Sequence, residues 1–475
     1  MSEERGSIST KIVGLYVFLL FCRILEMLPV FGLGELRPML LVTVVALVVV
    51  FATGNLVRAL KTPLGVLLIA WTCWMVVCMP FSTWRSETLN QFANNWLKSL
   101  AVFFIVAGLG STLLNYRKVI SAMGWAAAAA SLVVLPGIAS AGSGNGANDR
   151  LIGVGTLSNP NEIAFHLWLG MSFLLLLAVR SSRLRKFMLI AVCCFELVLI
   201  VKTVSREGLL LALAVFALAL IRVSTFNRIK LIATAFGVCI FAALSLSHES
   251  IERYMTLFNS HESGAAASSA EASSQMRQQK LIESIELTLR NPIFGVGMGV
   301  FMPASVEIAK ESGGKVDWEV SHNSYTQVSS ELGFPGILLL LAIYFTAWRQ
   351  LRQIDKAARR LEREDIRQLV FALHVALVIL CIHFCFDSMA YVFYMPLVMG
   401  LIAAFALSYG PVVLGEAEEE AADVLPETRP PWFVTTTPSR SWLGKEPCMA
   451  EPHAQVSRNP YRFGRRRSPL NGASD

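Results

Sequence analysis

The chain carries little charge. Asp, Glu, Lys and Arg make up 16% of its 475 residues, whereas hydrophobic residues make up 54% and the mean hydropathy is +0.55. A soluble globular chain carries roughly 25% charged residues. The deficit excludes an ordinary water-soluble domain, so the lipid bilayer is part of the solvent for this chain.

Patterns that hold metals or structural disulfides are also missing. None of the nine cysteines lies in residues 248–324, so a loop exported there has no disulfide framework. The seven histidines are scattered, and neither a Cys-x-x-Cys pair nor an HExxH motif occurs. There is no Asp-x-Asp of the kind that metal-dependent sugar transferases use. The sequence therefore predicts a protein without a metal or any other cofactor.

What the chain does contain is a series of apolar runs. Each is about 20 residues long, enough to cross a hydrocarbon core of roughly 30 Å. The pattern predicts an all-α polytopic membrane protein of about 12 transmembrane helices. The predicted spans are 11–33, 38–57, 62–81, 94–114, 119–140, 160–179, 187–203, 208–223, 229–247, 327–347, 369–387 and 391–409.

The basic residues indicate how these spans are oriented. With both termini inside, the loops on the inner side hold 18 Lys and Arg, whereas the short outer loops hold five. This asymmetry predicts cytoplasmic termini, and it explains the formal net charge of +7 without a nucleic-acid partner.

The predicted organisation has five parts. Residues 1–10 form a cytoplasmic N-terminus, 11–247 the first nine spans, 248–324 a long outer loop, 325–410 the last three spans, and 411–475 a cytoplasmic tail. The composition of the tail predicts disorder. The outer loop is far longer than a simple connector, and it separates spans nine and ten.

Within the outer loop, three smaller features follow one another. The Ser/Ala-rich stretch 263–275 predicts flexibility, and an amphipathic helix is expected to begin near Arg277 and to stop at Asn291-Pro292. Gly295, Gly297 and Gly299 fit neither a dinucleotide fingerprint nor a P-loop, so we expect a tight turn there.

An outward-facing membrane enzyme has no ATP and no nucleotide sugar, and receives its substrates through the membrane, typically on a lipid diphosphate. Transfer from such a donor needs positive charge for the departing diphosphate and a base for the attacking hydroxyl. Arginine pairs with phosphate oxygens in a fixed bidentate way. Arg150 and Arg206 lie at outer span ends, and Arg277 lies in the long loop. His322 is the candidate base, and Glu331 inside the following span is a further functional candidate.

Four segments resemble a known family. They are RLIGVGTLSNPNEIA at 150–164, VSREG at 204–208, NPIFGVGMGVF at 291–301 and HNSYTQVSSELGFPG at 322–336. Together they resemble the O-antigen ligase and Wzy-type polymerase superfamily. The resemblance implies a metal-independent glycosyltransferase in the bacterial inner membrane, acting on the periplasmic face. It implies an undecaprenyl-diphosphate-linked glycan as donor and a glycan or lipid A-core as acceptor.

The resemblance also implies residue roles. Arg150, Arg206 and Arg277 match diphosphate-binding arginines, and His322 matches the residue that activates the acceptor hydroxyl. Asn323, Tyr325 and Glu331 complete the motif as supporting residues. Glu207 departs from the pattern, since a small residue is expected after Arg206. Membrane lipids, a flippase and a chain-length regulator are the further partners implied.

Other interpretations stay open. Arginines at span ends often anchor a helix in the headgroups, and His322 could simply cap the tenth helix. His383, within a span, is expected to be a packed, hydrogen-bonded core residue, and Arg23 is expected to pair with Glu26. Twelve spans also suit a carrier such as a precursor flippase, although carriers place their polar groups near the bilayer midplane. Ligase and polymerase are not separated, with a slight preference for polymerase.

Overall fold

The computed structural model describes residues 8–31, 37–136, 150–153, 155–245, 251, 254, 265–311, 313 and 316–424. These residues belong to one compact unit, which is almost entirely helical and has no strand within the ranges just given. Residues 137–149, which include part of a predicted outer connection at 141–159, and the tail from 425 onward lie outside the described residues.

A helix occupies each of the twelve predicted ranges. These helices are α1 (Ile8–Cys22), α2 (Pro38–Ala52), α4 (Pro63–Cys78), α6 (Leu97–Leu109), α7 (Leu113–Val134), α9 (Pro160–Val179), α10 (Arg183–Lys202), α11 (Arg206–Arg222), α12 (Thr225–Ser245), α16 (Ser324–Arg360), α17 (Glu364–His383) and α18 (Tyr394–Val424).

Seven helical segments of the described chain are long and apolar enough to cross a membrane. They are Pro63–Phe81, Arg85–Leu109, Leu113–Val134, Pro160–Val179, Ser324–Arg360, Glu364–His383 and Tyr394–Glu420. The count of twelve spans therefore stays a prediction. α1 and α2 have only 15 residues each, and α10 begins with three basic residues in its first four, which lowers its hydropathy.

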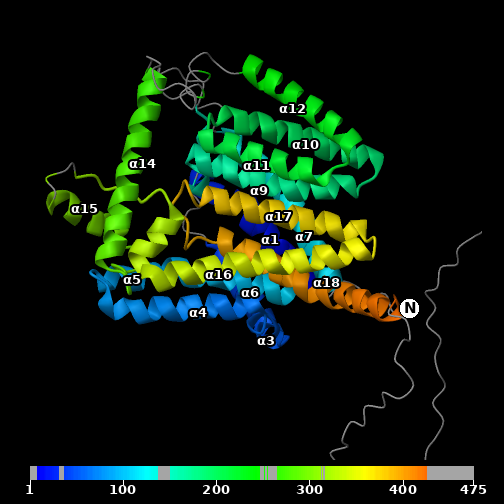
Figure 1. The fold of residues 1–475 in the computed structure, drawn as a ribbon, viewed down its shortest axis with the longest axis horizontal. Helices are drawn as coiled ribbons and strands as arrows, with labels where there is room; N and C mark the ends of the chain where they lie inside the picture. The colour runs from blue at the N-terminus through cyan, green and yellow to red at the C-terminus, as the bar shows by residue number, and fades with distance from the viewer. Residues whose placement is uncertain are drawn as a thin grey trace, which may run out of the picture. The chain divides into compact units, whose positions relative to one another are not determined.

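The helices of the bundle run side by side, and α14 (Ala265–Arg290) crosses one end of them (Figure 1). In the core, α7 packs against α1 and α9, and α18 packs against α6 and α16. We call the end crossed by α14 the α14 end; there α9, α11, α16 and α18 begin and α10 and α17 finish. The opposite end, which holds Arg222 and the basic residues from Arg349 to Arg367, is the basic end.

Three helices that begin at the α14 end start in the same way. Asn159, Ser205 and Asn323 are the N-caps of α9, α11 and α16, and each side chain accepts a hydrogen bond from a backbone N–H of the first turn. Such a cap stabilises a helix by about 1 kcal/mol relative to alanine. The caps fix the start of each helix. They also position Arg206, which follows Ser205, and His322, which precedes Asn323.

The structure corrects the predicted start of the loop helix. α14 begins at Ala265, not near Arg277, so the part of the stretch 263–275 that is described is helical instead of flexible. Alanine is the best helix former, and four of the first six residues of α14 are alanine, which outweighs the low complexity of the segment. The predicted stop before Asn291-Pro292 is confirmed. The last helix also continues beyond residue 410, because α18 reaches Val424.

The glycine turn at 291–300 is fixed to a break in α16. Gly333 has φ +68 and ψ −173 inside that helix, and this leaves backbone carbonyls without their helical partners. The carbonyls of Ser330 and Glu331 accept hydrogen bonds from the N–H groups of Val296 (2.9 Å) and Gly297 (3.0 Å). At Gly295, which has φ +68, a Cβ atom would lie 2.2 Å from the carbonyl carbon of Glu331. The docking therefore requires glycine at this position.

Replacement of Gly295 by alanine should destabilise the protein more than the same change at Gly313. The two glycines have nearly the same φ, +68 and +67, but a Cβ at Gly313 meets nothing within 4 Å. Gly313→Ala should cost only the roughly 1–2 kcal/mol of a left-handed alanine. Gly295→Ala adds a backbone clash, so its thermal unfolding midpoint in detergent should fall clearly below that of Gly313→Ala. Equal midpoints would contradict the docking.

Candidate active site

His322 lies directly before α16, in a backbone conformation that a side chain seldom adopts. Its φ is +51, in the left-handed region that costs a non-glycine residue roughly 1–2 kcal/mol. The adjacent residue, Asn323, caps α16 by accepting hydrogen bonds from the N–H groups of Tyr325 (3.0 Å) and Thr326 (3.1 Å). Asn323, not His322, is therefore the cap, which removes the capping interpretation of the histidine.

The turn after α17 holds the residues that follow His322. Ser324 N donates to the carbonyl of Phe384 (2.8 Å), and Ser324 Oγ donates to the carbonyl of Asp387 (2.6 Å). The hydroxyl of Tyr325 donates to the carbonyl of Cys381 at 2.9 Å. The start of α16 and the end of α17 are thereby joined into one unit at the α14 end.

Charged side chains from three elements surround His322. Burial is the largest cause of its lowered pKa, and the positive charge of Arg277 on α14 lowers that pKa further. Asp387 and Glu319 act in the opposite direction, and Glu319 Oε2 lies 3.8 Å from His322 Nε2. Because the pKa of His322 is below its ordinary value, its imidazole is neutral at neutral pH and can accept a proton.

The two outer-end arginines meet at the turn between α10 and α11. Arg150 Nε donates to the carbonyl of Thr203 (3.0 Å), and its Nη2 donates to Asn161 Oδ1 (3.5 Å). The same Asn161 oxygen accepts a hydrogen bond from Ser205 Oγ (2.6 Å), and Arg206 follows as the first residue of α11. Both arginines are partly exposed. The turn thus carries two cations next to one another.

A buried pair connects this turn to the region of His322. His383 at the end of α17 is hydrogen-bonded through Nδ1 to Glu207 on α11, and their side chains are 0% and 1% exposed. The His383 ring stacks on Phe165 with centroids 3.8 Å apart. Glu207 also interacts electrostatically with Asp387 and Arg277. This pair therefore connects the α10–α11 turn with the end of α17, which holds the start of α16 beside His322.

The core interpretation of His383 is confirmed, but its partner was not predicted. Glu207 was noted only as a departure beside Arg206, and positions 207 and 383 lie 176 residues apart. One sequence feature could have indicated the pairing: both are ionisable residues near the outer ends of predicted spans. The predicted pair of Arg23 with Glu26 is confirmed, with a distance of 2.8 Å.

Glu331 lies away from this set of contacts. Its Oε1 accepts a hydrogen bond from the backbone N–H of Phe301 (3.2 Å), at the start of α15 (Phe301–Glu311), so it supports the glycine turn. It also lines a cavity of about 580 Å³ together with Ser321, Gln327 and Ser388. The segment 320–327 therefore carries His322 and also lines part of this cavity.

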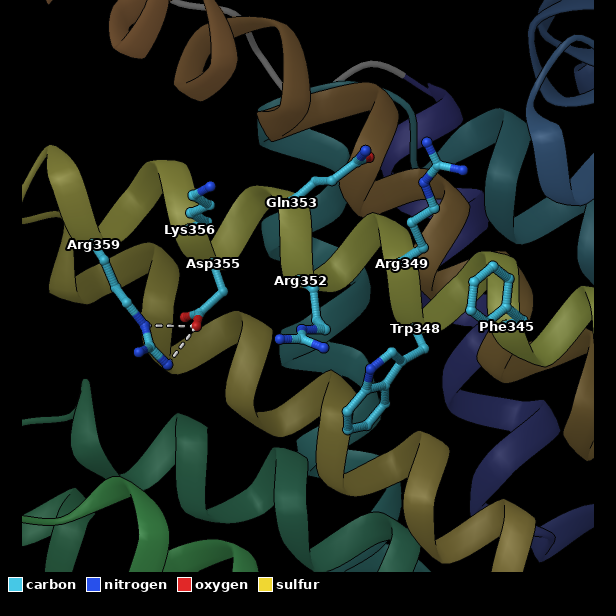
Figure 2. Close-up of a pocket in the computed structure, with 8 residues that line it drawn as sticks. All are labelled: Phe345, Trp348, Arg349, Arg352, Gln353, Asp355, Lys356 and Arg359. Atoms are coloured by element: carbon cyan, nitrogen blue, oxygen red, sulfur yellow. Dashed lines mark hydrogen bonds and ion pairs between the residues drawn. The ribbon is translucent and has the colours of Figure 1, made fainter. Parts of the chain in front are cut away.

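A second cavity, of about 510 Å³, lies at the basic end along α16. Figure 2 shows its lining, with Phe345 and Trp348 at one side and Arg349, Arg352 and Lys356 along the same helix. Arg359 pairs with Asp355 there, at 2.7 Å. None of the predicted site residues lines it, and its cations match the loop charges expected to face the cytoplasm.

No group of three or more His, Cys, Asp and Glu side chains among the described residues is arranged to hold a metal ion. The cation that acts on His322 is an arginine, Arg277 of α14.

Comparison with known families decides the relationship of the chain. Residues 187–341 match the family model described as O-antigen ligase. This segment of the chain is similar to the O-antigen ligase family. The O-antigen ligase domain runs from α10 into α16 and includes Arg206, Arg277 and His322, whereas Arg150 precedes it. No match was found among curated proteins. The family implies a membrane enzyme of polysaccharide biosynthesis, of the O-antigen ligase or polymerase type, with lipid-linked glycans as substrates.

Loss of one partner of the buried pair should be more damaging than loss of both. His383→Ala leaves the Glu207 carboxyl buried without its partner, and breaking such a pair costs about 3–5 kcal/mol. The double variant Glu207→Leu with His383→Phe removes both polar groups at similar volume and should unfold at a higher temperature than His383→Ala. Thermal unfolding of the purified variants in detergent measures this order. His374→Ala is the matched control, because His374 Nδ1 contacts only its own helix, at the carbonyl of Val370.

Proposed function

We propose that the protein is a metal-independent, inverting glycosyltransferase that transfers an undecaprenyl-diphosphate-linked glycan to a sugar hydroxyl. It would act as a repeat-unit polymerase or as an O-antigen ligase, with a slight preference for polymerase. The observation that carries the proposal is the joining of His322, Arg277 and the α10–α11 turn at the α14 end, within and beside an O-antigen ligase domain.

In the proposed reaction, the neutral imidazole of His322 takes the proton of the acceptor hydroxyl. The oxygen attacks the anomeric carbon of the donor sugar, and the bond from that carbon to the diphosphate oxygen breaks. The bonding electrons leave with the undecaprenyl diphosphate. A single displacement of this kind inverts the anomeric carbon, and a positioned base contributes about 10²- to 10⁴-fold in rate.

Arg150 and Arg206 would hold the departing diphosphate. Two guanidinium groups at one turn can neutralise the charge that develops on the leaving oxygen, and they do so without a metal ion. Arg277 would serve both ends of the reaction, because its charge acts on Glu207 beside Arg206 and also favours the neutral form of His322. Asn323 and Tyr325 would position His322, since they fix the start of α16 directly after it.

The α14 end would face the periplasm. The basic end carries the loop cations that favour the cytoplasm, and the site lies at the other end of the same helices. The enzyme would then sit in the bacterial inner membrane with both termini in the cytoplasm, and it would receive donor from a flippase and share product with a chain-length regulator.

His322→Ala should abolish glycan transfer in the native host, with a loss of about 10²-fold or more because the base is removed. Gel analysis of surface and lipid-linked glycans is the measurement. Accumulated single repeat units indicate a polymerase, and long lipid-linked chains that are missing from lipid A indicate a ligase. His374→Ala, a histidine of α17 whose Nδ1 contacts its own helix, should leave the glycans unchanged. Normal glycans in a well-expressed His322→Ala strain refute the catalytic role.

The pH dependence of transfer should report the surroundings of His322. Because the pKa of His322 is lowered, activity should fall only as pH drops below the ordinary histidine value of about 6.5. Glu319→Gln removes a negative charge that favours the protonated form, so the acid limb should move to lower pH. Arg277→Gln removes a positive charge, so the limb should move to higher pH. Initial rates against pH measure both shifts, and shifts in one common direction contradict the assignment.

A further inference from the structure

The cavity beside residues 320–327 has a wall that the proposed mechanism does not use. This wall is formed by α5 (Arg85–Gln91), the start of α6 and the π-helical turn Phe92–Trp96 that joins them. The opposite wall holds Ser321, Gln327 and Ser388. The cavity therefore shares its boundary with the segment that carries His322, and it has about 580 Å³ of space.

Four side-chain amides line this cavity. Gln91, Asn94 and Asn95 contribute from one wall, and Gln327 contributes from α16. An amide offers both a donor and an acceptor, which matches the hydroxyls of a sugar. The amides of the first wall are held in place by bonds to the preceding helical turn, since Gln91 Nε2 donates to Glu87 Oε1 (2.7 Å) and Asn95 donates to Gln91.

The backbone under these amides is unusual. Asn94 and Asn95 lie in the π-helical turn, and single π-helical turns within α-helices occur frequently at functional sites. The widened turn places two neighbouring asparagines on the cavity side, where a regular helix separates adjacent side chains by about 100°. Lys98, one turn further, adds a cation to the same lining.

Three polar side chains of the lining interact with one another. Glu331 and Tyr391 are only 1% and 6% exposed, and Glu331 interacts with both Tyr391 and Gln327. These contacts hold the polar part of this lining in place. Phe301 and Phe393 supply apolar surface in the same lining, which suits the carbon face of a sugar ring.

We propose that this cavity binds the sugar of the acceptor glycan, with Asn94 and Asn95 as its specificity-determining residues. That the bound glycan is the acceptor rests on the proposed function. In a single displacement the attacking oxygen approaches from the side opposite the leaving group. The arginines that would hold the leaving diphosphate lie at the α10–α11 turn. The cavity is lined by Arg23, which follows α1, and by residues of α5, α6 and α15. The segment that carries His322 belongs to both regions.

The test is binding of a free glycan to the full-length protein in nanodiscs, followed by saturation-transfer-difference NMR. The probe is the glycan released by mild acid from the lipid-linked pool of the native host, which therefore carries no diphosphate. Asn94→Ala combined with Asn95→Ala should weaken its binding about tenfold, because two hydrogen-bonding groups are lost. Asn55→Ala is the control, since Asn55, the first residue of α3 (Asn55–Leu60), donates to Thr53 and does not line the cavity.

A competitor separates the acceptor from the donor. Undecaprenyl diphosphate without sugar should leave the bound glycan in place. Displacement of the glycan by this lipid would assign the cavity to the donor and overturn the proposal. Equal binding of the glycan by the double asparagine variant and by wild type would also overturn it. The exposed side chains of Asn94 and Asn95 can be shortened without opening the core. A size-exclusion profile verifies folding, and Asn94→Gln combined with Asn95→Gln, which keeps both amides, should retain most of the binding.

The outcome of this experiment can be distinguished from the outcome for the proposed function. His322→Ala removes one hydrogen bond to the glycan and none of the side chains that line the cavity, so its binding should fall by less than that of the double asparagine variant. If His322→Ala keeps full transfer activity, the catalytic proposal fails while the binding site stands. If the glycan binds no form of the protein, the binding site fails while the catalytic proposal stands.

Discussion

The hydroxyl of Ser324 joins the start of α16 to the turn after α17. It donates to the carbonyl of Asp387 and accepts from the N–H of Met389 at 2.9 Å, and it is fully buried. His322 and its left-handed backbone precede this anchor by two residues, and the cavity wall follows it. Because a buried hydroxyl and two backbone groups satisfy one another, the anchor holds the strained residue without a disulfide or a metal.

The buried Glu207–His383 pair extends the same unit to the arginine turn. Ionisable groups in a low-dielectric interior are expensive, and they are tolerated when they are paired and hydrogen-bonded. Here the pair lies at the meeting point of α9, α11 and α17, where Phe165 stacks on the imidazole. A chain with a small residue at position 207 has no such connection between the first turn of α11 and the end of α17.

Much of the fold follows from local sequence. The apolar runs locate helices, Asn159-Pro160 and Ser205 mark helix starts, and Asn291-Pro292 marks the end of α14. These features depend on residues close together in the chain, so one sequence suffices to find them. The start of α14 was missed because alanine-rich composition suits both a flexible linker and a helix.

The site was predictable only in part. His322 and the arginines stood out because they are polar residues at the outer ends of apolar runs. The Glu207–His383 contact and the break of α16 under Gly295 depend on tertiary packing between distant segments, which no periodicity records. The amides at Gln91 to Asn95 lie across the predicted start of the span 94–114 and were not singled out, since the π-helical turn that presents them has no sequence signature of its own.

The interruption at Gly333 also separates two mechanical parts of α16. Residues before it are hydrogen-bonded to the glycine turn, whereas those from Phe334 onward continue as the long membrane helix. A helix whose hydrophobic length exceeds the bilayer thickness accommodates the difference by tilting. The break at Gly333 lies between the part of α16 that would tilt in this way and its first turns, which are hydrogen-bonded to the α17 turn beside His322.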